Sequence, residues 1–356
     1  MKIIHVVESF AGGVLDFLSD LTQGIPEYRH SIIHGIREDT PQSFRGFFPA
    51  NVEFYPWNSV KREISLFSDM HAFAELVRLL RTIGDCDIVH LHSSKAGVHG
   101  RIACRILGMH RRVVYTPHAA PFLRKDISPA VRQLYVAFEK VAAAAAGIVV
   151  ACSASESEAF RKAGINSTFI FNGIGCEGEV IRKAPGDKML VGTLGRITPQ
   201  KHPFLFNEIA FAFANDPFFS FIWIGDGEMK KELSSPNISV TGWLERGKAA
   251  ERLNDIDLYL STSRWEGMPL SVLMAMCAGK PLVLSDCVGN RDLVKEGING
   301  FLFVRAADAV TQVQQLFSDN AARDAMGKAS RELAINEFSL AKTLEAYRTL
   351  YRDISS

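Results

Sequence analysis

A glutamate and a proline follow an apolar segment near residue 260. The run Asp257–Thr262 predicts a buried strand, and Glu266 lies in the polar turn after it. Pro269 suits the first position of the next helix, because the missing N–H of proline costs no helical hydrogen bond there. The first N–H groups of a helix point outwards and attract anions. Glu266 and the helix entrance at residues 268–271 therefore predict a site for a phosphate-bearing ligand.

Two cations five residues apart follow the predicted strand Met189–Thr193. Arg196 can hold a phosphate in its planar guanidinium fork, and Lys201 adds a point charge. In isolation, such a pair is more typical of a solvated surface. Its place directly after the first strand of a predicted second domain favours the phosphate site.

Glycines lie at three further strand ends. Gly12 and Gly13 follow the first predicted strand, and glycines let the backbone approach a phosphate closely. Their spacing is not G-x-G-x-x-G, which argues against a nicotinamide cofactor. Gly225 follows another strand, and Gly242 precedes Trp243, whose indole could face a nucleobase. A simple loop or tight turn is the alternative at each position.

Histidines also lie at strand ends. His118 follows the predicted strand Arg112–Thr116. A lone histidine is usually structural or simply exposed, but ligand-binding side chains gather at the carboxyl ends of parallel strands. His90 and His92 share one face of the predicted strand Ile88–His92, and no carboxylate at a suitable spacing completes a metal site. We therefore expect no bound metal.

Strands alternate with helices along almost the whole chain, which predicts parallel sheets. We expect an α/β fold of two doubly wound domains that face a central cleft at the carboxyl ends of their strands. The predicted N-terminal domain spans residues 1–174 with about seven strands, and the C-terminal domain spans residues 188–336. Residues 175–187 form the predicted linker. We expect the helix within residues 337–356 to pack back on the first domain.

Composition and short patterns exclude several classes of protein. The net charge of +1 argues against bulk nucleic-acid binding. Six scattered cysteines without a C-x-x-C pair predict neither a disulfide scaffold nor a zinc site, and they fit a reducing cytosol. The longest apolar stretch, Val141–Cys152, is shorter than the roughly 20 residues of a membrane-spanning helix. The strings Asp85-Cys86-Asp87 and Asp255-Ile256-Asp257 could suggest Mg²⁺ sites, but each precedes a strand and we interpret both as strand lead-ins.

Taken in order, these motifs resemble those of the glycosyltransferase family 4 enzymes, which are retaining sugar-nucleotide transferases of GT-B architecture. The resemblance runs nearly end to end and is specific as a set, although no single motif is. It is carried by Gly12-Gly13, Thr116-Pro117-His118, Asn172-Gly173-Ile174, Gly195-Arg196 with Lys201, Gly225-Asp226-Gly227, Gly242-Trp243-Leu244 and Trp265-Glu266-Gly267-Met268-Pro269-Leu270. The segments His90–Gly97 and Phe122–Lys125 resemble the branch that builds bacterial surface polysaccharides.

The resemblance implies a role for each matching residue. Arg196 and Lys201 neutralise the diphosphate of the donor, the leaving group. Glu266 binds hydroxyls of the donor sugar, and His118 lies beside the donor sugar and the acceptor. Backbone groups at Gly12, Gly13, Met268, Leu270 and Ser271 add N–H donors to the diphosphate, and the region of Gly225, Gly242, Trp243 and Leu244 holds the nucleobase and ribose.

The resemblance also implies the reaction. The acceptor hydroxyl attacks the donor sugar on the face that the nucleotide leaves, and the donor phosphate takes the proton, so no general base is needed. Cations and helix dipoles stabilise the departing diphosphate. We therefore expect no metal and no cofactor, since the nucleotide-diphosphate sugar is a substrate.

One residue departs from the family pattern. The family has a second glutamate eight positions after the first, where it binds ribose hydroxyls, and this chain has Met274. Methionine accepts hydrogen bonds only weakly, and each lost bond costs on the order of 0.5–1.5 kcal/mol. A non-catalytic GT-B subunit therefore stays an alternative, as does a sugar-nucleotide epimerase, which would need acid and base carboxylates.

The acceptor side is expected in the first domain. We assign His92, Ser93 and Lys95 to it. Basic residues between Arg101 and Arg132 form either a solvated face or a surface for anionic lipid or a lipid-diphosphate acceptor, with Phe122 and Leu123 beside Arg124 and Lys125 as an interfacial loop. We expect a cytoplasmic enzyme at the inner face of the membrane, with a glycan or lipid-linked acceptor and no nucleic-acid partner.

Overall fold

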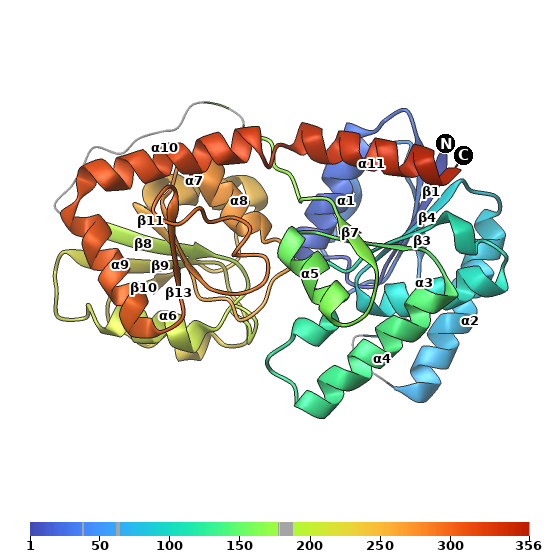
Figure 1. Ribbon diagram of the computed structural model, residues 1–356, viewed down its shortest axis with the longest axis horizontal. Coiled ribbons are helices and arrows are strands. Elements are labelled where there is room, and N and C mark those ends of the chain that lie inside the picture. The colour runs from blue at the N-terminus through green and yellow to red at the C-terminus, as the bar shows by residue number, and fades with distance from the viewer. Residues whose placement is uncertain (38, 62–64, 177, 179–187, 356) are drawn as a thin grey trace. The chain divides into compact units, whose positions relative to one another are not determined.

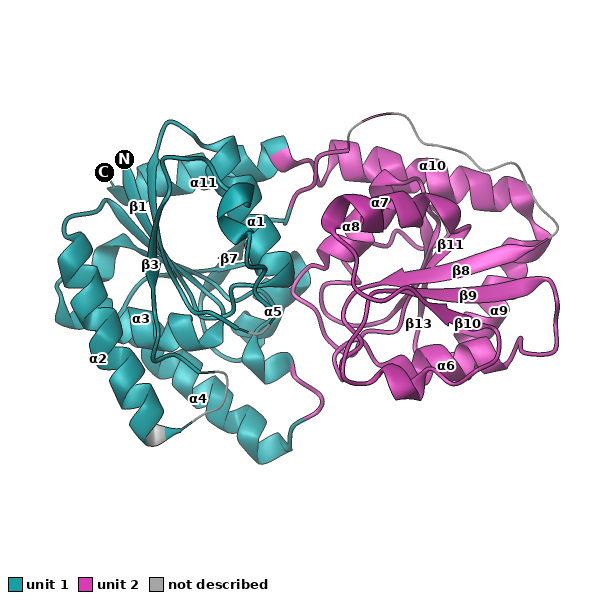
Figure 2. Ribbon diagram, turned by 180° about the vertical axis from the view of Figure 1, so that it is seen from behind, with its two compact units in different colours: residues 1–123, 127–172, 341–356 teal, residues 124–126, 173–340 magenta. Residues whose placement is uncertain are grey.

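The computed structural model describes residues 1–37, 39–61, 65–176, 178 and 188–355. Most of the predicted linker lies outside these residues. The described chain divides into two compact units (Figure 2). Unit 1 holds residues 1–123, 127–172 and 341–356, and unit 2 holds residues 124–126 and 173–340.

The described part of unit 1 is built on a parallel sheet of seven strands in the order β3-β2-β1-β4-β5-β6-β7. The strands are β1 (Lys2–Val7), β2 (Arg29–His34), β3 (Glu53–Pro56), β4 (Ile88–His92), β5 (Val113–Thr116), β6 (Ile148–Ala151) and β7 (Ser167–Phe169). Its α-helices are α1 (Gly12–Gly24), α2 (Leu66–Ile83), α3 (Ser94–Ile106), α4 (Pro129–Ala145), α5 (Ala154–Lys162) and α11 (Leu340–Ser355). Figure 1 shows that α11, at the end of the chain, runs beside α1.

The described part of unit 2 repeats the plan with a parallel sheet of six strands in the order β10-β9-β8-β11-β12-β13. The strands are β8 (Met189–Leu194), β9 (Phe219–Ile224), β10 (Ile238–Val240), β11 (Leu258–Ser261), β12 (Leu282–Ser285) and β13 (Gly300–Phe303). Its α-helices are α6 (Pro203–Phe211), α7 (Arg246–Asp255), α8 (Leu270–Cys277), α9 (Ala306–Ser318) and α10 (Asn320–Asn336).

The expected α/β fold with two doubly wound parallel sheets is confirmed. In each unit the strand order reverses beside the first strand, between β1 and β4 and between β8 and β11. Ligands bind at such switch points in doubly wound sheets, outside the carboxyl ends of the strands. The two D-x-D strings lie at the opposite ends of these strands. Asp87 accepts a hydrogen bond from the N–H of Lys2 at 2.8 Å, and Asp257 accepts one from the N–H of Leu190 at 2.7 Å.

Three helices differ from their predictions. Helix α8 begins at Leu270, and Pro269 is its N-cap rather than its first residue. The sequence after Gly227 predicts a helix over Glu228–Leu233, but the structure has a single 3₁₀ turn at Lys230–Glu232. Helix α5 was not predicted, although the Ser153 side chain caps it by accepting a hydrogen bond from the N–H of Glu156. No helix in the described ranges is both long and apolar enough to span a membrane.

Candidate functional site

Glu266 is the centre of the site in unit 2, at the switch point between β8 and β11. Its Oε1 lies 2.8 Å from the Lys201 Nζ and accepts a hydrogen bond of 2.8 Å from the Ser263 hydroxyl. Its Oε2 accepts a hydrogen bond of 3.0 Å from the Gln200 side chain. The carboxylate is buried, so its orientation is fixed by neighbours from both loops. The structure thus brings together two residues that the sequence places 65 positions apart.

The charge of Lys201 is retained in this setting. Burial is the largest single influence and lowers the pKa of the ammonium group, but the Glu266 carboxylate together with Tyr259 and Cys287 outweighs it, so the pKa is raised. The Lys201 Nζ also lies 3.5 Å from the Ser271 hydroxyl in the first turn of α8. A cation and a helix N-terminus therefore converge on one point, which is the arrangement that binds a phosphate. Arg196 is exposed on the same loop as Lys201.

Gln200 and Ser263 were not predicted as site residues. Gln200 directly precedes Lys201, and Ser263 lies shortly before Glu266. Their position in these two loops could have indicated that they belong to the site. A side-chain amide and a hydroxyl are suited to holding a carboxylate without neutralising it. Their role here is to orient Glu266.

The glycine turns of unit 2 pack against one another. The Trp223 indole N–H donates a 2.8 Å hydrogen bond to the Gly195 carbonyl, and a side chain at Gly225 would collide with that same carbonyl oxygen. Gly225 and Gly242 form an antiparallel bridge. Trp243 follows with its side chain exposed. The turns after β8, β9 and β10 therefore lie side by side and present an indole to solvent.

One stripe of α8 is only partly buried. It consists of Leu270, Ser271, Met274 and Cys277, which recur at helical spacing, whereas Met268 before the helix is buried. Met274 thus shares a helix face with the predicted phosphate-binding residue Ser271. This placement is the one expected of a residue that faces the nucleotide.

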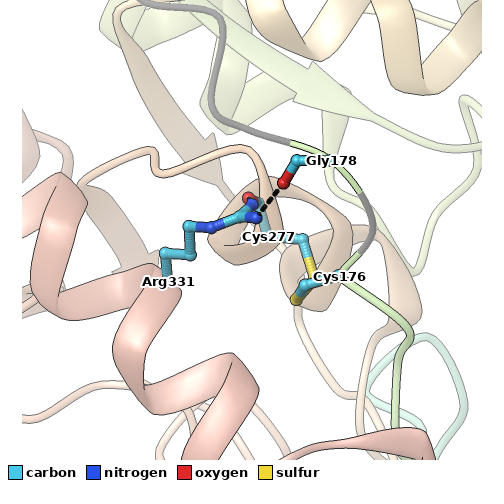
Figure 3. Close-up of a disulfide and its surroundings, with 4 residues drawn as sticks. All are labelled: Cys176, Gly178, Cys277 and Arg331. Carbon is cyan, nitrogen blue, oxygen red and sulfur yellow. Dashed lines mark hydrogen bonds between the residues drawn. A yellow bond between two sulfur atoms is a disulfide. The ribbon is translucent and has the colours of Figure 1, made fainter.

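The last residue of this stripe is covalently bonded to the segment at the start of residues 173–340 of unit 2. Cys277 forms a disulfide with Cys176 (Figure 3), with the two Cα atoms 5.1 Å apart. The expectation of unpaired cysteines is therefore wrong for this pair, because α8 brings together thiols that are 101 residues apart in the sequence. The Arg331 guanidinium of α10 donates hydrogen bonds to the carbonyl oxygens of Cys277 and Gly178. Linker, α8 and α10 are thus joined at one place.

Reduction of this disulfide should destabilise unit 2. Closing a loop of about 100 residues lowers the entropy of the unfolded chain, and native disulfides typically contribute about 2–4 kcal/mol. We expect the Cys176→Ser/Cys277→Ser variant to unfold at a lower denaturant concentration than the oxidised protein. The unreduced, denatured protein should titrate four thiols, and six thiols would contradict the pairing. Cys86→Ser is the control, since Cys86 is a free buried cysteine.

In unit 1, Gly12 and Gly13 are exposed at the start of α1, at the switch point between β1 and β4. Gly12 has a left-handed backbone (φ 54°), and a Cβ added there would have no described atom within 4 Å. The helix entrance is therefore open, as the phosphate prediction requires.

His118 lies in a strained turn after β5. Both His118 and Ala119 have positive φ (52° and 85°), which L-residues rarely adopt. The Glu156 carboxylate accepts hydrogen bonds from the N–H groups of Ala119, Ala120 and Cys152 at 2.8–3.0 Å. Glu156 was not predicted to matter, yet its spacing from Ser153 is the capping-box pattern that would have located it. This buried carboxylate holds the turn in place.

The His118 ring is one end of a row of four imidazoles. Nitrogen atoms 3.1 Å apart join His118 to His92, His92 to His5, and His5 to His30. The Nε2 of His30 faces the carbonyl oxygen of Ile25 and must therefore donate. That fixes every neutral ring in turn as an Nε2–H donor and an Nδ1 acceptor. The row ends where the Cys152 thiol, 3.5 Å from His118 Nδ1, supplies the last proton.

Burial keeps this row neutral. It lowers the pKa of His118 to about 3 and holds those of His5 and His92 well below the usual value, where neighbouring histidines lower them further. Beside the row, His90 is bonded to the Tyr351 hydroxyl of α11 at 2.7 Å and to the Thr116 hydroxyl at 2.8 Å. His5, His90 and His92 are close enough to suit a metal ion, but their ring nitrogens already have these partners.

Two acceptor-side predictions need correction. His92 is fully buried between His5 and His118, so it contacts His118 and not the surface. The Phe122 side chain is also buried, because it packs on Phe160 of α5, and so it is not part of an exposed loop. Ser93 is partly exposed with a positive φ of 69°, and Lys95 is paired with Asp69 of α2 at 2.8 Å.

Comparison with known proteins agrees with this geometry. The model described as "Glycosyltransferase Family 4" matches residues 11–177, and the one described as "Glycosyl transferases group 1" matches residues 179–333. The chain is 30% identical over 321 residues to the Escherichia coli UDP-Gal:alpha-D-GlcNAc-diphosphoundecaprenol alpha-1,3-galactosyltransferase, covering 82% of both chains. It is 24% identical to an uncharacterised 41.2 kDa protein in the cps region of Klebsiella pneumoniae, covering 99% of both.

The fold has solved counterparts. The crystal structure of Anabaena HepE in complex with UDP and glucose superposes with a TM-score of 0.78 at 19% identity, covering 99% of this chain and 100% of that one. The chain therefore belongs to glycosyltransferase family 4, has the GT-B fold, and is a glycosyltransferase of the surface-polysaccharide branch.

Proposed function

We propose that this enzyme transfers galactose, with retention, from UDP-galactose to N-acetylglucosamine on a diphosphate-linked lipid, at the inner face of the cell membrane. The observation that carries the proposal is the 30% identity with the E. coli galactosyltransferase over 82% of both chains. The geometry of unit 2 supports a nucleotide-sugar donor, because Lys201, Ser271 and the α8 entrance converge.

In this proposal Lys201, Arg196 and the first N–H groups of α8 stabilise the departing UDP. The acceptor hydroxyl attacks C1 of the sugar as the bond between C1 and the phosphate oxygen breaks. The acceptor proton passes to a phosphate oxygen of UDP, so atoms and charge balance without a protein base. Glu266, held by Lys201, Ser263 and Gln200, orients the sugar hydroxyls.

A donor panel tests the proposal. We would incubate the full chain with UDP-galactose, UDP-glucose, UDP-GlcNAc and GDP-mannose, and with a short-chain, water-soluble GlcNAc-diphosphate acceptor. We expect one galactose added in α-linkage, identified by mass and by the anomeric coupling constant. Transfer from a different donor only would contradict the sugar assignment. UDP binding without transfer from any donor would favour the non-catalytic subunit that Met274 suggests.

Met274→Glu should strengthen UDP binding. The side chain lies on the partly buried stripe of α8 with Ser271, and a carboxylate there gains hydrogen bonds to ribose hydroxyls. One or two such bonds, at about 0.5–1.5 kcal/mol each, correspond to roughly a 2- to 100-fold lower dissociation constant. Calorimetric titration with UDP measures this dissociation constant. Met274→Leu is the control and should bind as the parent does. An unchanged affinity in Met274→Glu would show that ribose binds elsewhere.

A further inference from the structure

Helix α4 exposes its apolar side chains to solvent. Val131, Leu134, Phe138 and Val141 are 39%, 50%, 42% and 64% exposed. Their spacing of three, four and three residues places them on one stripe of the helix. Scattered exposed apolar residues are ordinary, whereas a contiguous stripe of this kind marks an interaction surface.

The acidic residue of α4 faces inwards. Glu139 is buried and pairs with Arg101 of α3 at 2.5 Å, while the Tyr115 hydroxyl donates a 2.9 Å hydrogen bond to the same carboxylate. The Arg101 guanidinium also lies over the Tyr115 ring, 4.2 Å from its centre. The helix therefore buries a charged pair on its inner side and exposes four apolar side chains beside Lys140, which is unusual for a surface helix of a water-soluble domain. The buried side is anchored by this ion pair, while Val131, Leu134, Phe138 and Val141 stay exposed on the other side.

The segments around this stripe are strongly cationic. Between residues 88 and 155, the part of the sequence that belongs to unit 1 has a single acidic residue, Glu139, and it is paired with Arg101. Lys95 is paired with Asp69 of α2. The remaining cations have no acidic partner within this segment; they are Arg105, Arg111, Arg112, Arg132 and Lys140. The whole chain has a net charge of only +1, so the positive charge is concentrated here.

Neighbouring helices extend the surface. Helices α2, α3 and α4 lie side by side on one face of the sheet (Figures 1 and 2). Ile106 at the end of α3 is exposed, and Arg105 precedes it. Exposed apolar and basic side chains thus occur together on α3 and on α4, a mixture that is also found on helices that lie in a membrane interface.

We propose that the stripe Val131, Leu134, Phe138 and Val141 docks this enzyme on an anionic phospholipid bilayer. The apolar side chains enter the boundary between headgroups and acyl chains, and the surrounding cations contact lipid phosphates. A second copy of the chain is the other candidate, but a two-fold contact through α4 would bring two cationic surfaces together. The choice of a bilayer also rests on the proposed lipid-linked acceptor, which confines the reaction to a membrane surface.

Vesicle sedimentation tests the docking surface. We would use phosphatidylethanolamine vesicles with one quarter phosphatidylglycerol, and compare them with pure phosphatidylcholine vesicles. The enzyme should bind the anionic vesicles at least about tenfold more tightly, and added salt should weaken the binding. The double variant Leu134→Gln/Phe138→Gln should lose at least about tenfold in affinity. Phe204→Gln/Phe211→Gln is the matched control, because these exposed phenylalanines lie on α6 of unit 2.

Several results would overturn the proposal. They are absence of binding to the anionic vesicles, equal binding by the α4 variant, or a dimer in sedimentation velocity that the α4 variant abolishes while vesicles are not bound. Transfer to the water-soluble acceptor separates this proposal from the proposed function. An α4 variant that keeps this transfer but no longer binds vesicles supports docking through α4. Parent enzyme that binds vesicles but transfers no sugar contradicts the proposed reaction and leaves the docking surface standing.

Discussion

Glu266→Gln should lower kcat/KM for sugar transfer by about a hundred- to a thousand-fold. This expected loss in kcat/KM is the size found when one preorganised charged group is removed from a buried catalytic site. Glutamine keeps the length of the side chain and can still bond with Ser263, but it cannot pair with the Lys201 ammonium 2.8 Å away. The sugar would then be held by an amide whose donor and acceptor atoms are no longer fixed. Initial rates with UDP-galactose and the soluble acceptor measure the loss.

The same variant should also lose stability. Removing one partner of a buried ion pair leaves an uncompensated charge and costs about 3–5 kcal/mol. The effect here lies near the low end of this range, because the Lys201 side chain keeps some exposure and the Ser271 hydroxyl lies near its Nζ. Urea unfolding of both proteins gives the difference. A double variant, Glu266→Gln/Lys201→Met, should recover stability without recovering activity.

Glu337→Gln is the matched control for Glu266→Gln. Glu337 pairs with Lys295, but both side chains are nearly half exposed, and such surface pairs contribute about 0–1 kcal/mol. This variant should retain parental activity and stability. If Glu266→Gln retained parental activity as well, Glu266 would not contact the reacting sugar, and the site would have to be placed elsewhere.

The strands of both sheets are well predicted from the sequence. β1, β4 and β12 span the segments predicted from their branched and apolar residues, because a parallel strand covered on both faces is mostly apolar, although β1 and β4 also bury His5, His90 and His92. Strand ends then place Arg196, Lys201 and Glu266 at one edge, since parallel strands share a carboxyl edge. The pairing of β8 with β11 brings the loops of Lys201 and Glu266 together, but the ion pair itself is seen only in the structure.

The contacts that hold the site could not be predicted this way. The imidazole row joins residues of β1, β2, β4 and the turn after β5, and which strands are neighbours is a property of the fold, not of local pattern. The buried ion pair Arg101–Glu139 could not be predicted either, because the sequence around Arg101 suggests a solvated side chain. The disulfide was hidden because its cysteines are 101 residues apart.

Lowering the pH should destabilise unit 1 far more through its buried histidines than through its carboxylates. Burial lowers the pKa values of His5, His90, His92 and His118 below the ordinary histidine value of about 6.5. The unfolded chain then binds protons that the folded chain does not. Stability from these groups is therefore complete above about pH 6.5 and is lost as the pH falls below it. Carboxylates of unit 1 with lowered pKa values, such as Glu75, lose their contribution only at more acidic pH.

The expected loss is large because the effects add. At pH 5.5, each histidine that stays neutral in the fold costs roughly 1.4 kcal/mol relative to neutral pH, so four cost about 5–6 kcal/mol. That is comparable to the whole stability of many domains. The row also cannot accept one proton without damage, because each ring donates to one neighbour and accepts from the next. A protonated ring has an N–H on both nitrogens. Its Nδ1–H would then face the N–H of the neighbouring ring, and the hydrogen bond between them would be lost.

Urea unfolding at pH 7.5 and 5.5 measures this loss directly, and intermediate pH values give the number of protons taken up. His5→Gln should reduce that number by about one, because it removes one titrating ring from the middle of the row. His71→Gln is the control, since His71 is exposed on α2, away from the row. Equal stability at the two pH values would mean that the imidazoles are charged or solvated in the folded protein. His118 would then be free to accept a proton during catalysis, whereas a neutral row confines it to orienting the sugar and acceptor.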